Sequence, residues 1–338
     1  MAQTDSHGRS DGPILITGTT GFLGGALVRR LLASGHSPDR LRCLVRDPAR
    51  AAAAGLPAAS LLAGDLADPE GAPALRAAAR GAALVLHLAG TLKALDRAGF
   101  DRVNRDGTER LVAAVAAVAP AAHFVLVSSL AAAGPSVDGI GSDRLPDQTE
   151  PVSLYGASKR AGELAVVRGP LPWTIVRPPV VYGPGDAATR LLFRQANAPL
   201  VAVPRRPRPL SVIHADDVVD AVLAAADRRP VGAVLPLDGP ERTDTHALLR
   251  TIATACGRSA RLMPVPMPLA ALAACCADVW GRLRGDAGFF NRDKVREIRA
   301  AGWVADGSAA RTVLGVSPRV PLAAGLAAIA RAEGFVRR

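Results

Sequence analysis

Short, continuously apolar runs alternate with longer segments of helical periodicity through the first half of the chain. The apolar runs predict buried strands at 13–17, 41–45, 60–63, 83–88, 123–128 and 173–177. The periodic segments predict helices at 25–34, 103–118 and 154–168 and a further helix that closes at 76–80. Strands that are apolar throughout are typical of a parallel sheet covered by helices on both faces. The pattern therefore predicts an α/β fold with a doubly wound parallel sheet.

The pattern loosens after residue 182, where a proline-rich stretch at 199–209 and shorter helices follow. Residues 212–214 and 217–226 are expected to return to the sheet as a strand and a helix. We therefore expect a polar, disordered tail at 1–12 and a main domain at 13–185 to which 210–228 return. Residues 186–209 and 229–338 are expected to form a smaller domain.

One apolar segment has more than one interpretation. Residues 262–280 carry a single charge, Asp278, and prolines interrupt the first half of the segment. The uninterrupted remainder is too short to cross a bilayer. It is expected to be a buried helix, or else a helix that lies on a membrane or lines an apolar substrate tunnel.

Composition narrows the function classes. The formal net charge is +11 and the sequence pI is about 10.7, but the positive residues are scattered and form no basic tract. Neither zinc-ligand spacing nor an aromatic-laced basic motif accompanies them, so neither a nucleic-acid partner nor a metal is expected. Residues 1–12 lack the apolar stretch of a secretion signal, and a cytoplasmic location follows as an expectation.

A glycine-rich segment joins the first predicted strand to the first predicted helix. Gly18, Gly21 and Gly24 stand at a three-residue spacing, with Thr20, Phe22 and Leu23 between them. Glycine permits a tight turn and a close approach of the backbone to a pyrophosphate, and the helix N-terminus offers free N–H groups. In this strand-to-helix context the segment predicts a dinucleotide site.

The end of the second predicted strand bears on which dinucleotide binds. Arg46 stands there, and its charge and fork geometry suit the 2′-phosphate of NADP. Asp47 follows and could still contact a ribose, so NAD stays open as an alternative. Asp65, at the end of the third strand, is placed either to accept from an adenine amino group or to cap the next helix.

Tyr155 and Lys159 form a candidate acid–base pair. Their spacing puts both side chains on one face of the helix predicted at 154–168. A neighbouring ammonium favours a phenolate, so Lys159 is expected to lower the pKa of Tyr155. A phenol that exchanges protons near neutral pH can act as an acid–base catalyst for an alcohol or a carbonyl.

Together these motifs resemble the extended short-chain dehydrogenase/reductase family, in its NAD(P)-dependent epimerase/dehydratase group. The resemblance runs in order along nearly the whole chain, through the glycine segment 17–24, Gly64-Asp65-Leu66, His87-Leu88-Ala89-Gly90, Asn104 with Gly107-Thr108, Ser128-Ser129, Tyr155 with Lys159, the segment 177–184, and His214-Ala215-Asp216-Asp217. It implies that the main domain is an NAD(P)-binding Rossmann domain and that the smaller C-terminal domain binds substrate. It also suggests a homodimer formed through paired helices.

The resemblance implies roles for individual residues. Tyr155 would be the general acid/base, Lys159 would bind the nicotinamide ribose, and Ser129 would hold the substrate oxygen. Asn104, His87 and His214 would have structural roles. The residues implied to contact the cofactor are Gly18, Thr20, Gly21, Phe22, Leu23, Gly24, Arg46, Asp65, Leu66, Leu88, Ala89, Gly90, Tyr155, Lys159, Pro178 and Val181.

Departures from relatives in the family indicate the substrate class. Residues 130–132 lack the acidic pair of the sugar dehydratases, and Val180 stands where epimerases carry a sugar-binding asparagine. What remains is similar to hydroxysteroid dehydrogenase-like and dihydroflavonol reductase-like members. We expect an NADP-dependent oxidoreductase acting on a hydrophobic ketone or secondary alcohol that is steroid-, keto-lipid- or flavonoid-like. The alternatives are an NAD-dependent nucleotide-sugar epimerase and a non-catalytic nucleotide-binding subunit.

Overall fold

The computed structural model describes residues 12–285, 288 and 290–336 of the 338-residue chain. The disordered tail expected at 1–12 lies, apart from Gly12, outside the described residues. The larger part of the molecule is a seven-stranded sheet in which every pair of neighbours is parallel. The predicted α/β fold with a doubly wound parallel sheet is confirmed.

The order of the strands fixes where a ligand can bind. From one edge to the other the strands are β10 (Ala233–Pro236), β6 (Trp173–Arg177), β5 (His123–Val127), β4 (Leu84–His87), β1 (Ile14–Thr17), β2 (Leu41–Val45) and β3 (Leu61–Ala63). The chain runs outward from β1 in one direction and then outward from β4 in the other. Beyond the carboxyl ends of β1 and β4 lies the switch point at which sheets of this kind bind ligands.

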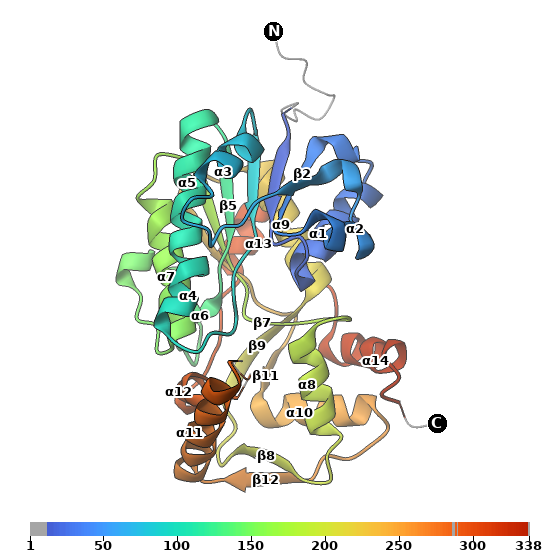
Figure 1. The fold of residues 1–338 in the computed structure, drawn as a ribbon. Helices are drawn as coiled ribbons and strands as arrows, with labels where there is room; N and C mark the ends of the chain where they lie inside the picture. Colours follow the sequence, from blue (N-terminus) through green and yellow to red (C-terminus); the bar gives the residue numbers. More distant parts are fainter. Residues whose placement is uncertain (1–11, 286–287, 289, 337–338) are drawn as a thin grey trace.

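Helices cover both faces of this sheet (Figure 1), and each face has its own apolar core. One face carries α1 (Phe22–Ala33), α9 (Ala215–Arg228) and α13 (Ser308–Leu314). The other carries α3 (Ala72–Ala79), α5 (Asp106–Val118) and α7 (Leu154–Val167). The main part also holds three short helices: α4 (Arg97–Asn104) and α6 (Leu130–Ala133), which pack against α7, and α2 (Pro48–Ala53), which lies next to β3. The single helix predicted at 103–118 is thus two helices, α4 and α5.

The smaller part of the molecule lies beyond the carboxyl ends of the strands (Figure 1). It holds a three-stranded sheet of β11 (Arg242–Asp244), β9 (Pro209–His214) and β7 (Val180–Tyr182), and a two-stranded sheet of β8 (Val201–Pro204) and β12 (Leu262–Val265). Its helices are α8 (Ala187–Ala196), α10 (Thr245–Ala255), α11 (Met267–Arg284), α12 (Arg292–Arg299) and α14 (Leu322–Ala332). A third apolar core lies among α8, α10, α14 and the strands β8 and β9.

The strand expected to return to the main sheet is a different one. Residues 212–214 lie in β9, which pairs with β7 and β11, whereas β10 is the seventh strand of the main sheet. The helix expected at 217–226 does pack on the main sheet as α9, and His214 caps it by accepting from the N–H of Asp216 at 3.2 Å. Both strands are short apolar runs, so the sequence pattern does not say which sheet each one joins.

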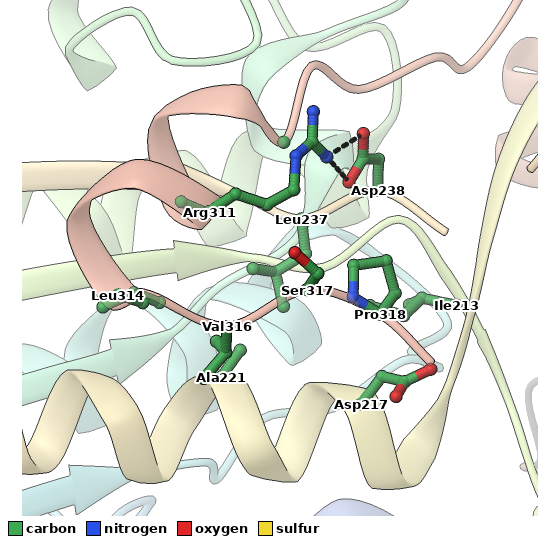
Figure 2. A pocket seen from close by; sticks show the side chains of 12 residues that line it. Ile213, Asp217, Ala221, Leu237, Asp238, Arg311, Leu314, Val316, Ser317 and Pro318 are labelled. Atoms are coloured by element: carbon green, nitrogen blue, oxygen red, sulfur yellow. Dashed lines mark hydrogen bonds and ion pairs between the residues drawn. The ribbon is translucent and has the colours of Figure 1, made fainter. Parts of the chain in front are cut away.

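The C-terminal segment also contributes to the main layer. Figure 2 shows Arg311 of α13 reaching across to Asp238, which follows β10, and the two Nη1···Oδ distances are 2.6 and 2.7 Å. Ala310 and Leu314 of the same helix belong to the apolar core that α1 and α9 share. Residues from 229 onward therefore serve both parts of the molecule, rather than the smaller part alone.

Helix α11 is exposed. Only Ala274 and Gly281 of this helix are buried, and Leu269, Leu272 and Leu283 are more than half exposed, at 57%, 62% and 76%. The interpretation of 262–280 as a buried helix is therefore wrong. Within the described ranges, no helix is both long and apolar enough to cross a membrane.

Candidate active site

The glycine segment forms a tight cradle between β1 and α1. Gly18 has a φ of 76°, which favours glycine. A Cβ atom on Gly18 would lie 2.6 Å from the backbone nitrogen of Ala89, and one on Gly24 would lie 2.1 Å from the carbonyl oxygen of Gly18. Gly21 stands at the N-cap of α1, and no side chain in the described part of the chain caps that helix. Its first N–H groups can therefore bind an anion, which is the fit that a dinucleotide pyrophosphate requires.

Three predicted cofactor residues after β4 lie directly against this cradle. The backbone of Leu88 and Ala89 packs on Gly18, and the N–H of Leu88 donates to the carbonyl of Thr17 at 3.2 Å. Gly90 lies on the other side, where an added Cβ would be 3.6 Å from Nζ of Lys159. Residues 88–90 thus connect the glycine cradle to the predicted catalytic lysine across the switch point.

The predicted adenosine side of the site holds the cation Arg46 and two acids that already accept hydrogen bonds, Asp47 and Asp65. Arg46 is exposed just beyond β2. Asp47 caps α2 by accepting from the N–H of Arg50 at 3.0 Å, so part of its carboxylate is already in use. Asp65 closes its own turn by accepting from the N–H of Ala67 at 2.9 Å. Of these groups, Arg46 has the charge and exposure that a 2′-phosphate needs.

Leu66, after β3, and the segment after β6 both lie at the carboxyl ends of the strands of the main sheet. The carbonyl of Leu66 accepts from Nε and Nη2 of Arg110 at 3.0 and 2.7 Å. The carbonyl of Pro178 accepts from the N–H of Leu130, next to Ser129, at 2.8 Å. Val181 lies in β7, directly after this point. Hydrogen bonds to their backbone carbonyls hold Leu66 and Pro178 in place, and strand pairing with Ile213 of β9 holds Val181.

Thr20 and Phe22 flank Gly21 at the start of α1, within the glycine cradle. The Phe22 ring lies against Gly183, whose added Cβ would be 2.7 Å from Cζ of that ring. Thr20 is exposed and Leu23 is half-buried. The contact between Phe22 and Gly183 joins the start of α1 to the end of β7. The glycine cradle therefore meets the segment that carries the predicted contact residue Val181.

The structure brings Ser129 and Tyr155 together. Ser129 caps α6, where its Oγ accepts from the N–H of Ala131 at 3.1 Å. Tyr155 lies in the first turn of α7, and the Ser129 hydroxyl lies close enough to its phenol to lower the pKa of Tyr155. The Tyr155 ring packs beside Phe100, with 6.1 Å between ring centroids. Two neighbouring hydroxyls can together hold a carbonyl or alcohol oxygen.

The pKa of Tyr155 is not lowered, contrary to the expectation from its spacing to Lys159. Burial is the main cause that raises the pKa of Tyr155 to about 12; Ser129 opposes the shift and the charge of Glu297 adds to it. The Lys159 ammonium is buried and donates to the carbonyl of Val127 at 3.0 Å, and burial lowers its pKa to about 8. Desolvation is the largest cause for both groups. The Tyr155 phenol is therefore protonated at neutral pH.

Helix α12 anchors α7, the helix that carries Tyr155 and Lys159, and the sequence did not reveal this contact. Asp293 accepts from the N–H groups of Leu154 and Tyr155, at 2.7 Å to Oδ1 and 3.1 Å to Oδ2. Ser153, the N-cap of α7, donates to Oε1 of Glu297 at 2.9 Å. Negative charge at a helix N-terminus is favourable. The only trace in the sequence is an acidic pair spaced by one helical turn, Asp293 and Glu297.

A fully buried ion pair between Arg177 and Glu163 ties α7 to the end of β6. Arg177 at the end of β6 donates from Nε and Nη2 to the two carboxylate oxygens of Glu163, at 2.9 and 2.7 Å, and both side chains are 0% exposed. Nη1 of Arg177 donates to the carbonyls of Ser142 and Arg144, at 2.8 and 2.7 Å. The pair therefore fixes both α7 and the loop that joins α6 to α7.

Asn104 and His87 occupy the bracing positions expected of them. Asn104 donates to Oγ of Ser158 at 2.9 Å and so ties α4 to α7. The His87 ring is buried between the hydroxyls of Thr17 and Thr108, at 2.6 and 2.9 Å. Burial lowers the pKa of His87 to about 3, so its ring is neutral.

Comparisons with known proteins agree with this geometry. The model of the NAD dependent epimerase/dehydratase family matches residues 14–234. A ceramide reductase of Caulobacter vibrioides is 39% identical over 297 residues, which are 86% of each chain. The crystal structure of gox2253 superposes with a TM-score of 0.74 at 26% identity and covers 97% of this chain and 100% of its own. MoeE5 in complex with UDP-glucuronic acid and NAD has the same fold, with a TM-score of 0.71 at 23% identity, and covers 95% of this chain and 100% of its own.

The ordered motifs, the parallel sheet with its glycine cradle, and the family match over most of the main domain agree with one another. The chain belongs to the NAD dependent epimerase/dehydratase family, within the extended short-chain dehydrogenases/reductases, and is an NAD(P)-dependent oxidoreductase.

Proposed function

We propose that the protein is an NADP-dependent reductase of a hydrophobic ketone, and that its substrate is a keto-lipid of the ceramide class. The observation that carries the proposal is the Ser129–Tyr155 hydroxyl pair, with Tyr155 held protonated by burial beside a buried Lys159. A protonated phenol is the state that a carbonyl reduction requires, because the product oxygen must receive a proton. The ceramide reductase at 39% identity supports the lipid class.

Each residue of the site has one part in the proposed ketone reduction. When bound, the nicotinamide cofactor supplies the hydride for the substrate carbon. Ser129 and Tyr155 orient the carbonyl oxygen, and Tyr155 gives it a proton. Lys159, anchored at Val127 and next to Gly90, is the residue that would hold the nicotinamide ribose. The cradle at Gly18 to Gly24 would hold the pyrophosphate.

Arg46 is the reason to prefer NADP over NAD. It is exposed at the end of β2, while the neighbouring carboxylate of Asp47 caps α2. An arginine fork gives charge-assisted bonds to a phosphate, and an acid committed to a helix cap is a poor partner for ribose hydroxyls. Asp65 and Leu66 would border the adenine.

The loop between α6 and α7 supports an apolar substrate. It joins the helix capped by Ser129 to the helix that carries Tyr155, and its exposed apolar side chains are Val137, Ile140, Leu145 and Val152. Val180 is 37% exposed in β7, where a polar anchor would be expected for a sugar nucleotide. Apolar walls with a few polar groups at the reacting atoms are typical of lipid and drug-sized ligands.

An epimerase acting on a nucleotide sugar is the second candidate. It is favoured by the fold shared with MoeE5, whose structure holds UDP-glucuronic acid and NAD. The apolar residue at Val180 argues against it, since a buried sugar-diphosphate site relies on polar partners. A cytoplasmic location and a homodimer stay predictions.

The test is the reduction of a long-chain keto-amide lipid with NADPH, with NADH and UDP-glucose plus NAD as comparisons. Tyr155→Phe should lower kcat by roughly a hundredfold to ten-thousandfold while nucleotide binding persists, because only the proton donor is lost. Tyr182→Phe is the matched control, since the chain has two tyrosines and the buried Tyr182 hydroxyl has no hydrogen-bond partner among the described residues. Full activity of Tyr155→Phe, or turnover of UDP-glucose alone, would overturn the proposal.

A further inference from the structure

Helix α11 presents its apolar side to the outside of the molecule. The large exposed side chains of this 18-residue helix follow helical spacing along one face, and they are Leu269, Leu272, Val279, Trp280 and Leu283, each at least 57% exposed. The buried face carries the small residues Ala274 and Gly281. A surface helix ordinarily turns its large apolar residues toward the core, so this helix has the reverse orientation. We call these five exposed residues the apolar stripe.

Segments that adjoin α11 carry further exposed apolar side chains. Met263 in β12 and Phe290, which follows the helix, are 43% and 41% exposed. Leu92 and Leu95, in the segment after Gly90, are 63% and 42% exposed. A pocket between that segment and α11 is lined in part by Leu95 and Gly281, so this segment lies against the buried face of the helix, opposite the stripe. In Figure 1, α11 lies at the outer edge of the smaller part of the molecule.

Positive charge borders the apolar stripe. Exposed basic residues occupy the last turn of α11 and the adjoining α12, and they are Arg282, Arg284, Arg292, Lys294, Arg296 and Arg299. The guanidinium of Arg284 lies over the Trp280 ring, 4.4 Å from its centroid. Asp293 and Glu297 of α12 bond to the N-terminus of α7, and they also pair with Arg296 at 3.4 Å and with Lys294 at 2.5 Å. The other four cations keep the margin basic. The outward face therefore combines apolar side chains, an indole and a basic margin.

We propose that α11 docks on the surface of an anionic lipid bilayer. Leucines and a tryptophan on one face with arginines at the margin are the features of helices that lie in the plane of a bilayer interface. Each Lys or Arg near such a surface is attracted by its negative potential. Asp278, Arg282 and Arg284 within α11 oppose a transmembrane placement, in keeping with its failure to qualify as a span.

A second copy of the chain is a poorer occupant of the apolar stripe. An 18-residue helix is about 27 Å long and about 10 Å wide, which gives a footprint of roughly 270 Å² per partner. A stable interface buries about 800 Å² per partner. Two copies would also bring their basic margins together, and like charges repel. An anionic bilayer complements both the stripe and the margin.

Docking here would place the catalytic helix near the bilayer, because α12 lies against α11 and bonds to the N-terminus of α7. A lipid could then pass from the leaflet to Tyr155 without crossing water. This delivery step rests on the proposed keto-lipid function. Docking itself does not, and it can be tested without any substrate.

The test is flotation of the full-length protein with vesicles of phosphatidylcholine alone or mixed with phosphatidylglycerol. Wild type should bind the anionic vesicles, release at high salt, and show a blue shift of tryptophan emission. Leu272→Glu/Leu283→Glu should weaken vesicle binding by about a hundredfold or more, since two leucines that the bilayer would cover become charged. Leu191→Glu is the matched control, because this helical leucine of α8 is 44% exposed and lies outside the stripe. Circular dichroism melts check that all variants fold.

The outcomes separate the alternatives. Docking is overturned if wild type ignores anionic vesicles, or if the stripe variant binds them as well as Leu191→Glu does. It is also overturned if sedimentation shows a wild-type dimer that the stripe variant dissolves, because the stripe is then an interface between copies. Vesicle binding without reduction of any ketone would uphold docking and refute the keto-lipid function. Reduction of a water-soluble short-chain ketone should be unchanged in the stripe variant.

Discussion

Removal of the Asp293 carboxylate should disturb catalysis without touching the substrate. Asp293 accepts from the N–H groups of Leu154 and Tyr155 at 2.7 and 3.1 Å, and its side chain is 12% exposed. Asp293→Ala leaves two N–H groups at the start of α7 without their acceptor. Because Tyr155 is in that first turn, the change should shift the phenol as well as loosen the helix.

The structure sets the size of the effect. A hydrogen bond to a charged group contributes about 1.5–3 kcal/mol, and a charge at a helix N-terminus adds about 0.3–1 kcal/mol. Ser153 still caps α7 through the N–H of Gly156 at 3.0 Å, and water can replace part of what is lost. We therefore expect the free energy of unfolding to fall by about 2–3 kcal/mol. A displaced donor should lower kcat by roughly tenfold to a hundredfold.

The assay pairs urea unfolding with NADPH-dependent ketone reduction, and Asp244→Ala is the matched control. Asp244 also accepts two backbone N–H bonds, from His246 at 2.7 Å and Ala247 at 2.9 Å, at the start of α10. Asp244→Ala should lower the free energy of unfolding by a comparable amount, about 1–2 kcal/mol for a lost cap, and leave kcat unchanged. If Asp293→Ala and Asp244→Ala lose stability alike and both keep full kcat, α12 does not position Tyr155, and the reasoning is refuted.

Three further predictions follow from named contacts. Arg46→Asp should shift the ratio of kcat/KM for NADPH over NADH by about 1–3 kcal/mol toward NADH; an unchanged ratio would show that another group reads the 2′-phosphate. Glu163→Gln should lower the free energy of unfolding in urea by about 3–5 kcal/mol, because it leaves the guanidinium of the fully buried Arg177 without its anion; a loss below about 1 kcal/mol would contradict this. The pKa of Lys159 is lowered to about 8 from 10.5, so the unfolded chain holds more protons between these values and wild-type stability should rise with pH from about 8 to 10.5. Subtracting the urea-unfolding curve of Lys159→Met should isolate a rise of about 3 kcal/mol, and parallel curves would argue against the lowered pKa.

Local patterns predicted the core of the fold and the arrangement of the site. The glycine segment lies where a strand meets a helix, and Tyr155 and Lys159 share one helix, so each prediction needed only neighbouring residues. The parallel sheet followed from continuously apolar strands in the same way.

What the sequence could not give depends on tertiary contacts. The pKa of Tyr155 is raised rather than lowered because its phenol is buried, and burial is a property of the folded molecule. Asp293 meets Tyr155 across 138 residues of chain, a separation that no spacing rule covers. Helix α11 reads as a core element because its residues are apolar, yet nothing in the described part of the molecule covers its outer face. In each case the sequence shows which residues are present but not what surrounds them in the folded molecule.

The contacts that Asp293 and Glu297 of α12 make with the start of α7 also limit how the enzyme can diversify. Exchanging α11 and α12 for the corresponding segment of a relative would remove these contacts together with the apolar stripe. A graft that keeps acids at the positions of Asp293 and Glu297 should leave Tyr155 in its present position. Recombination among relatives is thus expected to succeed when the acidic pair is exchanged together with the helix start that it contacts.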